Sequence, residues 1–237
     1  MTDKILIVDD VHTYIGEFYI LQGVSFSVGK NEITAVLGRN GAGKTTLMRT
    51  IIGVYKPAKG KIIFKNNDIT RLPTHKIVRL GIAYVPSERS IFTDLTVEEN
   101  LKLAYRGSRN KFREKLEEIF ELFPDLKRFY KQKGRNLSGG QQKMLAIACG
   151  LINDVDLLML DEPSEGLSPK YVLELFSTIS DLRERTTILI VEQNFAVVKK
   201  IADYGYIIDN GKIVAEGTME EIASNKELLR KYLGVGK

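Results

Sequence analysis

Short runs of apolar residues, separated by polar or small ones, divide this chain into predicted strands and helices. Two runs near the start, residues 5–11 and 24–28, contain polar positions among the apolar ones and are typical of strands with one buried face. Later runs are apolar almost throughout, as strands buried on both faces are; they are residues 33–37, 82–85, 157–160 and 186–191.

Helical spacing of apolar residues fills the segments between these strands. Residues 46–55 and 171–185 each predict a helix, and the pattern between about residue 96 and residue 152 is mostly helical. Because helices alternate with buried strands, the chain predicts an α/β fold with a parallel sheet. We expect a single domain over residues 1–237. Its α/β core spans 1–86 and 155–237, and a mostly helical subdomain spans 87–154.

A glycine-rich loop, GRNGAGKTT, separates the apolar run 33–37 from the helical pattern 46–55. It matches GxxxxGK[ST] in full, and a strand before it and a helix after it are the context in which such a loop cradles phosphates. A tight turn that merely needs glycine would not require a lysine followed by a hydroxyl. We therefore predict an ATP site lined by Gly38, Arg39, Asn40, Gly41, Ala42, Gly43, Lys44, Thr45 and Thr46, with Lys44 on the β and γ phosphates and Thr45 on Mg²⁺.

Two acids end the apolar run LLML, at Asp161 and Glu162. The carboxyl ends of strands in an open α/β sheet are where ligands bind. Asp161 is expected to hold Mg²⁺, and Glu162 to polarise the water that attacks the γ phosphate. The alternative, a helix cap, accounts less well for two acids directly after four apolar residues.

A serine and two glycines begin the helical pattern NLSGGQQKMLAIACGLI, residues 136–152. Ser138 alone fits an ordinary helix N-cap, and a helix start of this kind also suits an anion. The succession of the glycine loop, LSGGQ and the acidic strand end resembles the ATP-binding cassette (ABC) family over nearly the whole chain. The resemblance implies a P-loop NTPase core with a helical subdomain and an N-terminal antiparallel β region.

The resemblance also implies roles for residues that spacing does not reveal. In cassettes two subunits pair head to tail, so Ser138, Gly139, Gly140 and Gln141 would act on the ATP held by Lys44 of a second ATPase subunit, either an identical or a related chain. Tyr14 stands where the family stacks an aromatic ring on adenine, although it also fits a partly buried strand residue.

Two positions depart from the usual pattern of the family. Ser87 replaces the glutamine that follows the strand IAYVP, which leaves the contact of that glutamine with metal and water in doubt. Gln193 replaces the switch histidine; it can hydrogen-bond a γ-phosphate oxygen but cannot carry a positive charge. We take Lys44, Glu162 and Gln193 as the catalytic set.

Finer features resemble the ATP-binding subunit of branched-chain amino acid importers, the LivF type: AYVPSERSIF, LTVEENL, EPSEGLSP and ILIVEQN. This resemblance implies transmembrane permease subunits as partners and an extracytoplasmic substrate-binding protein in the same system. It implies a peripheral position on the cytoplasmic face of the cell membrane. The cofactors are expected to be ATP and Mg²⁺.

Composition changes this picture little. The chain has one cysteine among 237 residues, no apolar run long enough to span a bilayer, and a formal net charge of +5. The basic stretch 127–135 is expected on the exposed side of a helical segment, and no nucleic acid is expected. Two alternatives stay open: a soluble ABC-type ATPase acting on nucleic acid or ribosomes, and a slow nucleotide-gated assembly subunit, which Ser87 and Gln193 motivate.

Overall fold

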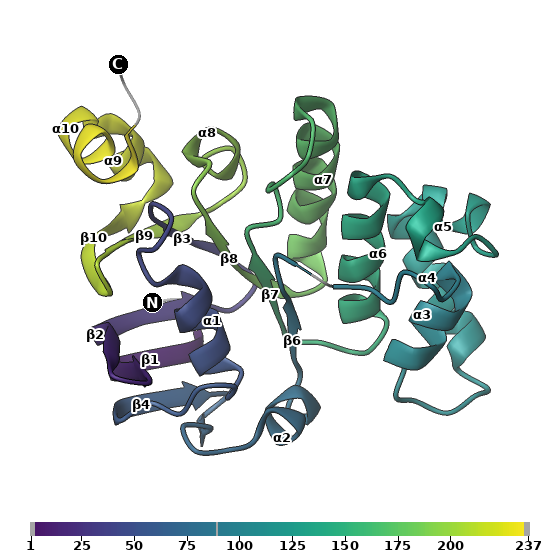
Figure 1. Ribbon diagram of the computed structural model, residues 1–237, viewed down its shortest axis with the longest axis horizontal. Coiled ribbons are helices and arrows are strands. Elements are labelled where there is room, and N and C mark those ends of the chain that lie inside the picture. The colour runs from purple at the N-terminus through teal and green to yellow at the C-terminus, as the bar shows by residue number, and fades with distance from the viewer. Residues whose placement is uncertain (1–2, 89, 235–237) are drawn as a thin grey trace.

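The computed structural model describes residues 3–88 and 90–234, which form two sheets flanked by helices (Figure 1). The first sheet is antiparallel and has the order β2-β1-β4-β5. It is the antiparallel region expected at the start of the chain. Its strands are β1 (Lys4–Ile15), β2 (Phe18–Gly29), β4 (Lys59–Phe64) and β5 (Asn67–Asp68).

The second sheet has the order β10-β9-β3-β8-β7-β6, and all neighbours in it are parallel except β9 and β10. Every residue of β3, β7 and β8 is buried, because helices or the first sheet cover both faces. This is the parallel sheet that the apolar runs predict. Its strands are β3 (Ile33–Leu37), β6 (Ile82–Val85), β7 (Leu157–Asp161), β8 (Thr187–Glu192), β9 (Tyr204–Asp209) and β10 (Lys212–Thr218).

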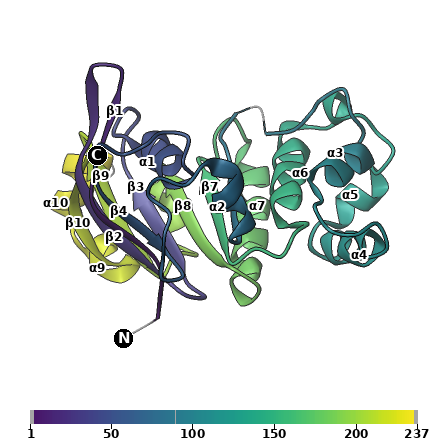
Figure 2. The same cartoon turned by 90° about the horizontal axis from the view of Figure 1, so that it is seen from below.

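The helices fall into groups around the second sheet. A group lies together at the far end from the first sheet in both views (Figures 1 and 2): α3 (Val97–Ala104), α4 (Phe112–Leu122), α5 (Pro124–Arg128), the short 3₁₀ helix η1 (Gly134–Asn136) and α6 (Gly139–Leu151). The others are α1 (Lys44–Ile51), α2 (Thr74–Arg79), α7 (Pro169–Asp181), η2 (Leu182–Glu184), α8 (Phe195–Val198), α9 (Met219–Ser224), α10 (Lys226–Leu228) and η3 (Leu229–Leu233). None of the helices in the described ranges combines the length and the hydrophobicity needed to cross a membrane.

Two hydrophobic clusters hold the layers together. One lies between the first sheet and the second, and Leu47, Met48 and Ile51 of α1 are fully buried in it. The other joins the opposite face of the second sheet to α3, α4, α6 and α7. Alternate residues of β3 enter different clusters, Val36 the first and Leu37 the second, as a strand buried on both faces requires.

Parallel pairing brings the ends of three strands to one edge of the sheet. Leu37 at the end of β3 pairs with Glu192 at the end of β8, and Asp161 at the end of β7 pairs with Val191. The glycine loop and the acids that follow β7 therefore begin next to one another. This edge positions the candidate site.

The prediction for residues 127–135 is wrong in part. Helix α5 ends at Arg128, and Lys133 forms an isolated antiparallel bridge with Thr96. The backbone N–H groups of Gly134 and Arg135 donate to the carbonyls of Leu95 and Thr93, at 2.8 Å each. Pairing with residues 93–96 therefore takes the place of a helix at residues 129–133, and the short 3₁₀ helix η1 begins at Gly134.

Candidate active site

The glycine loop ends in a helix start that is open to an anion. Gly43, the N-cap of α1, has φ of 108°, a left-handed conformation that side-chain-bearing residues rarely adopt. No side chain caps α1, and its first turn contains no acid. Its free N–H groups and the positive end of the helix dipole thus remain available to a phosphate.

Lys44 is buried at the centre of the loop, with only 3% of its side chain exposed. Its Nζ donates to the carbonyl oxygens of Gly38 at 2.8 Å and Arg39 at 2.9 Å, and lies 3.0 Å from Glu162 Oε1. The ammonium group therefore links the loop directly to the acid after β7.

Thr45 and Asp161 form the part of the site that fits a divalent cation. The Thr45 hydroxyl donates to Asp161 Oδ1 at 3.2 Å, and the Tyr84 hydroxyl donates to Oδ2 at 2.8 Å. Burial raises the pKa of Asp161, against the hydrogen bonds from Tyr84 and Thr45. A hydroxyl beside one carboxylate is the sparse donor set typical of Mg²⁺ with a polyphosphate, whose oxygens and waters complete the octahedron. The described residues contain no cluster of three or more acidic, histidine or cysteine ligands.

Glu162, Gln193 and Asn40 line one cavity of about 380 Å³ next to the loop. Glu162 has φ of 45°, which is unusual for a residue other than glycine, and its N–H donates to the Val191 carbonyl at 2.9 Å. The turn after β7 thus directs this carboxylate toward Lys44. The structure brings these predicted residues of the loop, β7 and β8 into one place.

Glu192, which motif reading misses, positions the segment that carries Gln193. Its buried carboxylate accepts the N–H of Ser164 at 2.8 Å on one oxygen. The other oxygen accepts the N–H groups of Gln193 at 3.0 Å and Asn194 at 3.2 Å. One acid therefore ties the turn after β7 to the turn after β8. An acid at the end of an apolar strand is the signal that could have identified it.

Lys143, the second residue that motif reading misses, holds the segment around Ser87. It extends from α6, is only 7% exposed, and its Nζ donates to the Ser87 carbonyl at 2.5 Å. Burial lowers the pKa of Lys143, while the carboxylates of Glu165 and Asp161 raise it. A lysine among the apolar residues of α6 is the sequence signal for this contact.

The signature residues lie apart from the glycine loop within one chain. Ser138 caps α6: its Oγ accepts the Gln141 N–H at 3.3 Å, and Gln141 Oε1 accepts the Ser138 N–H at 2.9 Å. Ser138 and Gly139 are exposed, whereas Gly140 is buried against Tyr171. Strands and other helices lie between α1 and the start of α6 in both views (Figures 1 and 2). One chain alone therefore does not bring Ser138 to the phosphate loop.

Two other predicted binding residues, Tyr14 and Arg39, do not point into the interior of the glycine loop. Tyr14, near the end of β1, is 48% exposed, and the ring of Tyr19 stacks on one face of it at 4.5 Å. Its exposure leaves it accessible to a purine base. The guanidinium of Arg39 reaches the carbonyl of Arg230 at 3.4 Å, so this side chain points to the C-terminal segment instead of the loop interior.

The comparisons with known proteins agree with this geometry. The family model described as "ABC transporter" matches residues 21–165. The chain is 40% identical to the high-affinity branched-chain amino acid transport ATP-binding protein BraG of Pseudomonas aeruginosa, over 95% of this chain and 98% of that protein. It is 36% identical to the lipopolysaccharide export system ATP-binding protein LptB of Haemophilus influenzae, over 91% of each. The crystal structure of an ATP-binding cassette of an ABC transporter in its ADP conformation superposes with a TM-score of 0.88 at 29% identity, covering all of both chains.

Proposed function

This chain belongs to the ABC transporter family and is an ATPase of that type, and we propose that it is the motor subunit of an importer for branched-chain or related amino acids. The observation that carries the proposal is the meeting of Lys44, Thr45, Asp161 and Glu162 at one sheet edge, in a chain that matches BraG along nearly its whole length. LptB, a relative from an export system, shows that the fold alone does not set the direction of transport.

The geometry supports the following roles during hydrolysis. Lys44 leaves Glu162 and binds the β and γ phosphates of ATP, for which the free N–H groups of α1 supply further donors. Glu162, no longer paired, accepts a proton from the attacking water. Gln193 donates its amide N–H to a γ-phosphate oxygen. Thr45 and Asp161 would hold Mg²⁺, which neutralises charge on the phosphates when bound.

Pairing of two ATPase subunits completes each site in this proposal. Ser138 and Gly139 are exposed at the start of α6, and the phosphate loop of the same chain lies elsewhere. A second copy, or a related cassette chain, would bring Ser138, Gly139, Gly140 and Gln141 to the ATP on Lys44. ATP bound between the subunits would then stabilise the pair by mass action.

The partner surface for permease subunits is proposed to be a groove of about 330 Å³ between the core and the helices α3 and α6. Val54 and Tyr84 line it on the core side, and Ala104 and Cys149 on the helical side. Val54 is exposed, and so is Leu103 of α3, the residue before Ala104. Such apolar exposure supports a protein contact. We place the chain on the cytoplasmic face of the membrane, with an extracytoplasmic substrate-binding protein in the same system.

Affinity purification from detergent-solubilised membranes of the native host tests this assignment. We expect permease subunits and a second cassette chain to co-purify, and Val54→Asp to reduce their recovery while ATP binding persists. Amino acids bound to the associated substrate-binding protein would identify the cargo. Lipopolysaccharide export components in their place would refute the importer assignment, and recovery with nucleic acid or ribosomes would favour the soluble alternative.

The rival of a slow gating subunit is tested separately by turnover. We expect steady-state phosphate release by the wild type to exceed that of Glu162→Gln by at least about a hundredfold, since the general base is lost. Equal, negligible rates in both proteins would support nucleotide gating without hydrolysis. The same variant should form an ATP-bound dimer on a sizing column.

A further inference from the structure

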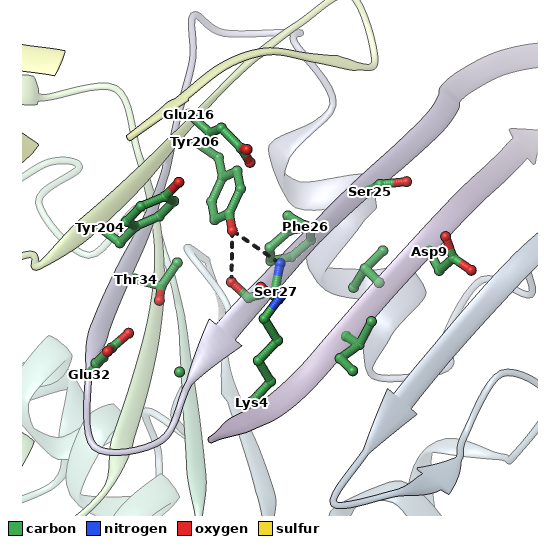
Figure 3. A pocket seen from close by; sticks show the side chains of 13 residues that line it. Lys4, Asp9, Ser25, Phe26, Ser27, Glu32, Thr34, Tyr204, Tyr206 and Glu216 are labelled. Carbon is green, nitrogen blue, oxygen red and sulfur yellow. Dashed lines mark hydrogen bonds between the residues drawn. The ribbon is translucent and has the colours of Figure 1, made fainter. Parts of the chain in front are cut away.

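A second cavity, of about 470 Å³, lies between the two sheets (Figure 3). Glu32 and Thr34, at the start of β3, line it, whereas the glycine loop follows the other end of the same strand. Five strand residues separate the two places by about 16 Å. The cavity is therefore distinct from the proposed nucleotide site.

Aromatic rings form one wall of this cavity. Tyr204 and Tyr206 point from β9 toward the first sheet, with ring centroids 5.2 Å apart, and Phe26 packs edge-on against Tyr206 at 5.4 Å (Figure 3). The Tyr206 hydroxyl donates to the Ser27 carbonyl at 3.1 Å and accepts the Ser27 N–H at 3.3 Å. Tyr206 is thus fixed across the gap between the sheets, as a preformed wall.

Two carboxylates face the same space without a cationic partner. Neither Glu32 nor Glu216 forms an ion pair or a side-chain hydrogen bond within residues 3–88 and 90–234. Glu216 pairs across β9 and β10 with Tyr206, so the acid stands beside the ring. Burial, and then the charge of Glu216, raises the pKa of Tyr204.

The Glu32 carboxylate can lie at the cavity because Gly29 has no side chain to occupy the same space. A Cβ at Gly29 would lie 2.1 Å from Glu32 Oε2 and 2.5 Å from its carboxyl carbon, so the carboxylate occupies the space above the glycine. Any larger residue there would displace it. The cavity thus has an acidic side chain in its wall, although the whole chain has a formal net charge of +5.

Thr34 adds a polar side chain to the wall of the cavity. Its side chain is 1% exposed and lines the cavity next to Tyr204, with which it pairs across β3 and β9. Its hydroxyl is a neutral hydrogen-bonding group on the wall of the cavity, to which a polar group of a bound molecule can donate or from which it can accept.

We propose that this cavity binds a small molecule carrying an ammonium group, held by the tyrosine rings and by the carboxylate of Glu216 beside Tyr206, while Glu32 adds negative charge at the other end of the cavity. Aromatic faces attract cations, and hydrogen bonds from an ammonium to a carboxylate are charge-assisted. The same chemistry belongs to simple organic cations and to amino acids. Lys4, which also lines the cavity, distinguishes them, because its ammonium favours the carboxylate of an amino acid and repels a second cation.

Calorimetric titration of the full chain with putrescine, choline and leucine tests the proposal. 1,4-Butanediol and 3,3-dimethylbutanol are the matched neutral probes for the first two. We expect at least one ammonium probe to bind saturably, about tenfold or more tighter than its neutral counterpart or, for leucine, than 4-methylpentanoic acid, which lacks the ammonium. Saturating ATP should leave this binding in place.

Variants locate the binding. Glu216→Gln, at an exposed position, should weaken it about tenfold, and Gly29→Ala, which displaces the Glu32 carboxylate, should weaken it by a smaller factor. Glu220→Gln removes the same charge from an exposed acid outside the cavity and should leave affinity unchanged. Lys4→Gln should weaken leucine and not putrescine or choline. Equal binding of charged and uncharged probes, or equal effects of Glu216→Gln and Glu220→Gln, would overturn the proposal.

Discussion

In the proposed mechanism, ATP and Glu162 compete for the ammonium group of Lys44, which forms an ion pair with Glu162 in the structure. Its atoms lie 3.0 Å apart, and the side chains are 3% and 17% exposed, so solvent screens the pair weakly. To bind, the polyphosphate must draw the Lys44 ammonium away from the Glu162 carboxylate. The carboxylate also repels the phosphates, because both groups are negatively charged. We therefore predict that Glu162→Gln binds ATP more tightly than the wild type while it loses hydrolysis.

The magnitude follows from the contacts that remain. In the variant Lys44 keeps its bonds to the carbonyls of Gly38 and Arg39, and an amide oxygen replaces the carboxylate. The change from a charged to a neutral acceptor costs the nucleotide-free state about 1.5 kcal/mol, which corresponds to roughly tenfold tighter binding. Unfolding free energy without nucleotide should fall by a similar amount.

Equilibrium titration with a hydrolysis-resistant ATP analogue measures this gain without interference from turnover. It should be done at protein concentrations at which sizing shows monomers, so that pairing does not add to the affinity. Glu165→Gln is the matched control, because Glu165 is an exposed acid of the same turn with no contact to Lys44. An unchanged affinity in Glu162→Gln, or the same gain in Glu165→Gln, would refute the competition between Glu162 and phosphate.

Three further predictions concern the helical part of the chain. A Cβ on Gly140 would meet the Tyr171 ring at 2.8 Å, so Gly140→Ala should cost about 1–2 kcal/mol in thermal unfolding, whereas Gly139→Ala, with 3.8 Å of room, should not. Two lysines lower the pKa of Glu98 from 4.5 to about 2, so Glu98→Gln should destabilise by up to about 1 kcal/mol at pH 7. That difference should shrink in denaturation curves as the pH falls from 4.5 toward about 2, because the wild-type carboxylate is then protonated. Lys143→Met removes the buried ammonium group and should leave the free energy of unfolding unchanged. A decrease in that free energy of more than about 1 kcal/mol would contradict this.

The local sequence pattern predicts the buried part of the fold well, because a run of apolar residues is stable only where it is shielded from water. The strands β3, β6, β7 and β8 all appear where the sequence is apolar almost throughout. The meeting of the glycine loop with Asp161 follows as well, since parallel strands align their carboxyl ends. The Thr45–Asp161 hydrogen bond joins residues 116 positions apart, yet the motif order anticipates it.

Polar contacts made by residues outside the motifs are not predictable in this way. Glu192 reaches a backbone N–H 28 positions away, and Lys143 reaches a carbonyl 56 positions away. Their identities show a charge on an apolar element but not which distant backbone group it meets. The hairpin β9–β10 is absent from the expectations too, although Asn210 and Gly211, both with positive φ, form the turn that such a dipeptide favours.

The distance between the glycine loop and Ser138 within one chain has a genetic consequence. Where two copies pair, Lys44→Ala and Ser138→Ala each damage both sites of their own dimer. A mixed dimer instead collects both lesions in one site and leaves the other site wild type. Mixing equal amounts of the two inactive variants should therefore restore about a quarter of all sites. Intragenic complementation would then be a direct test of head-to-tail pairing.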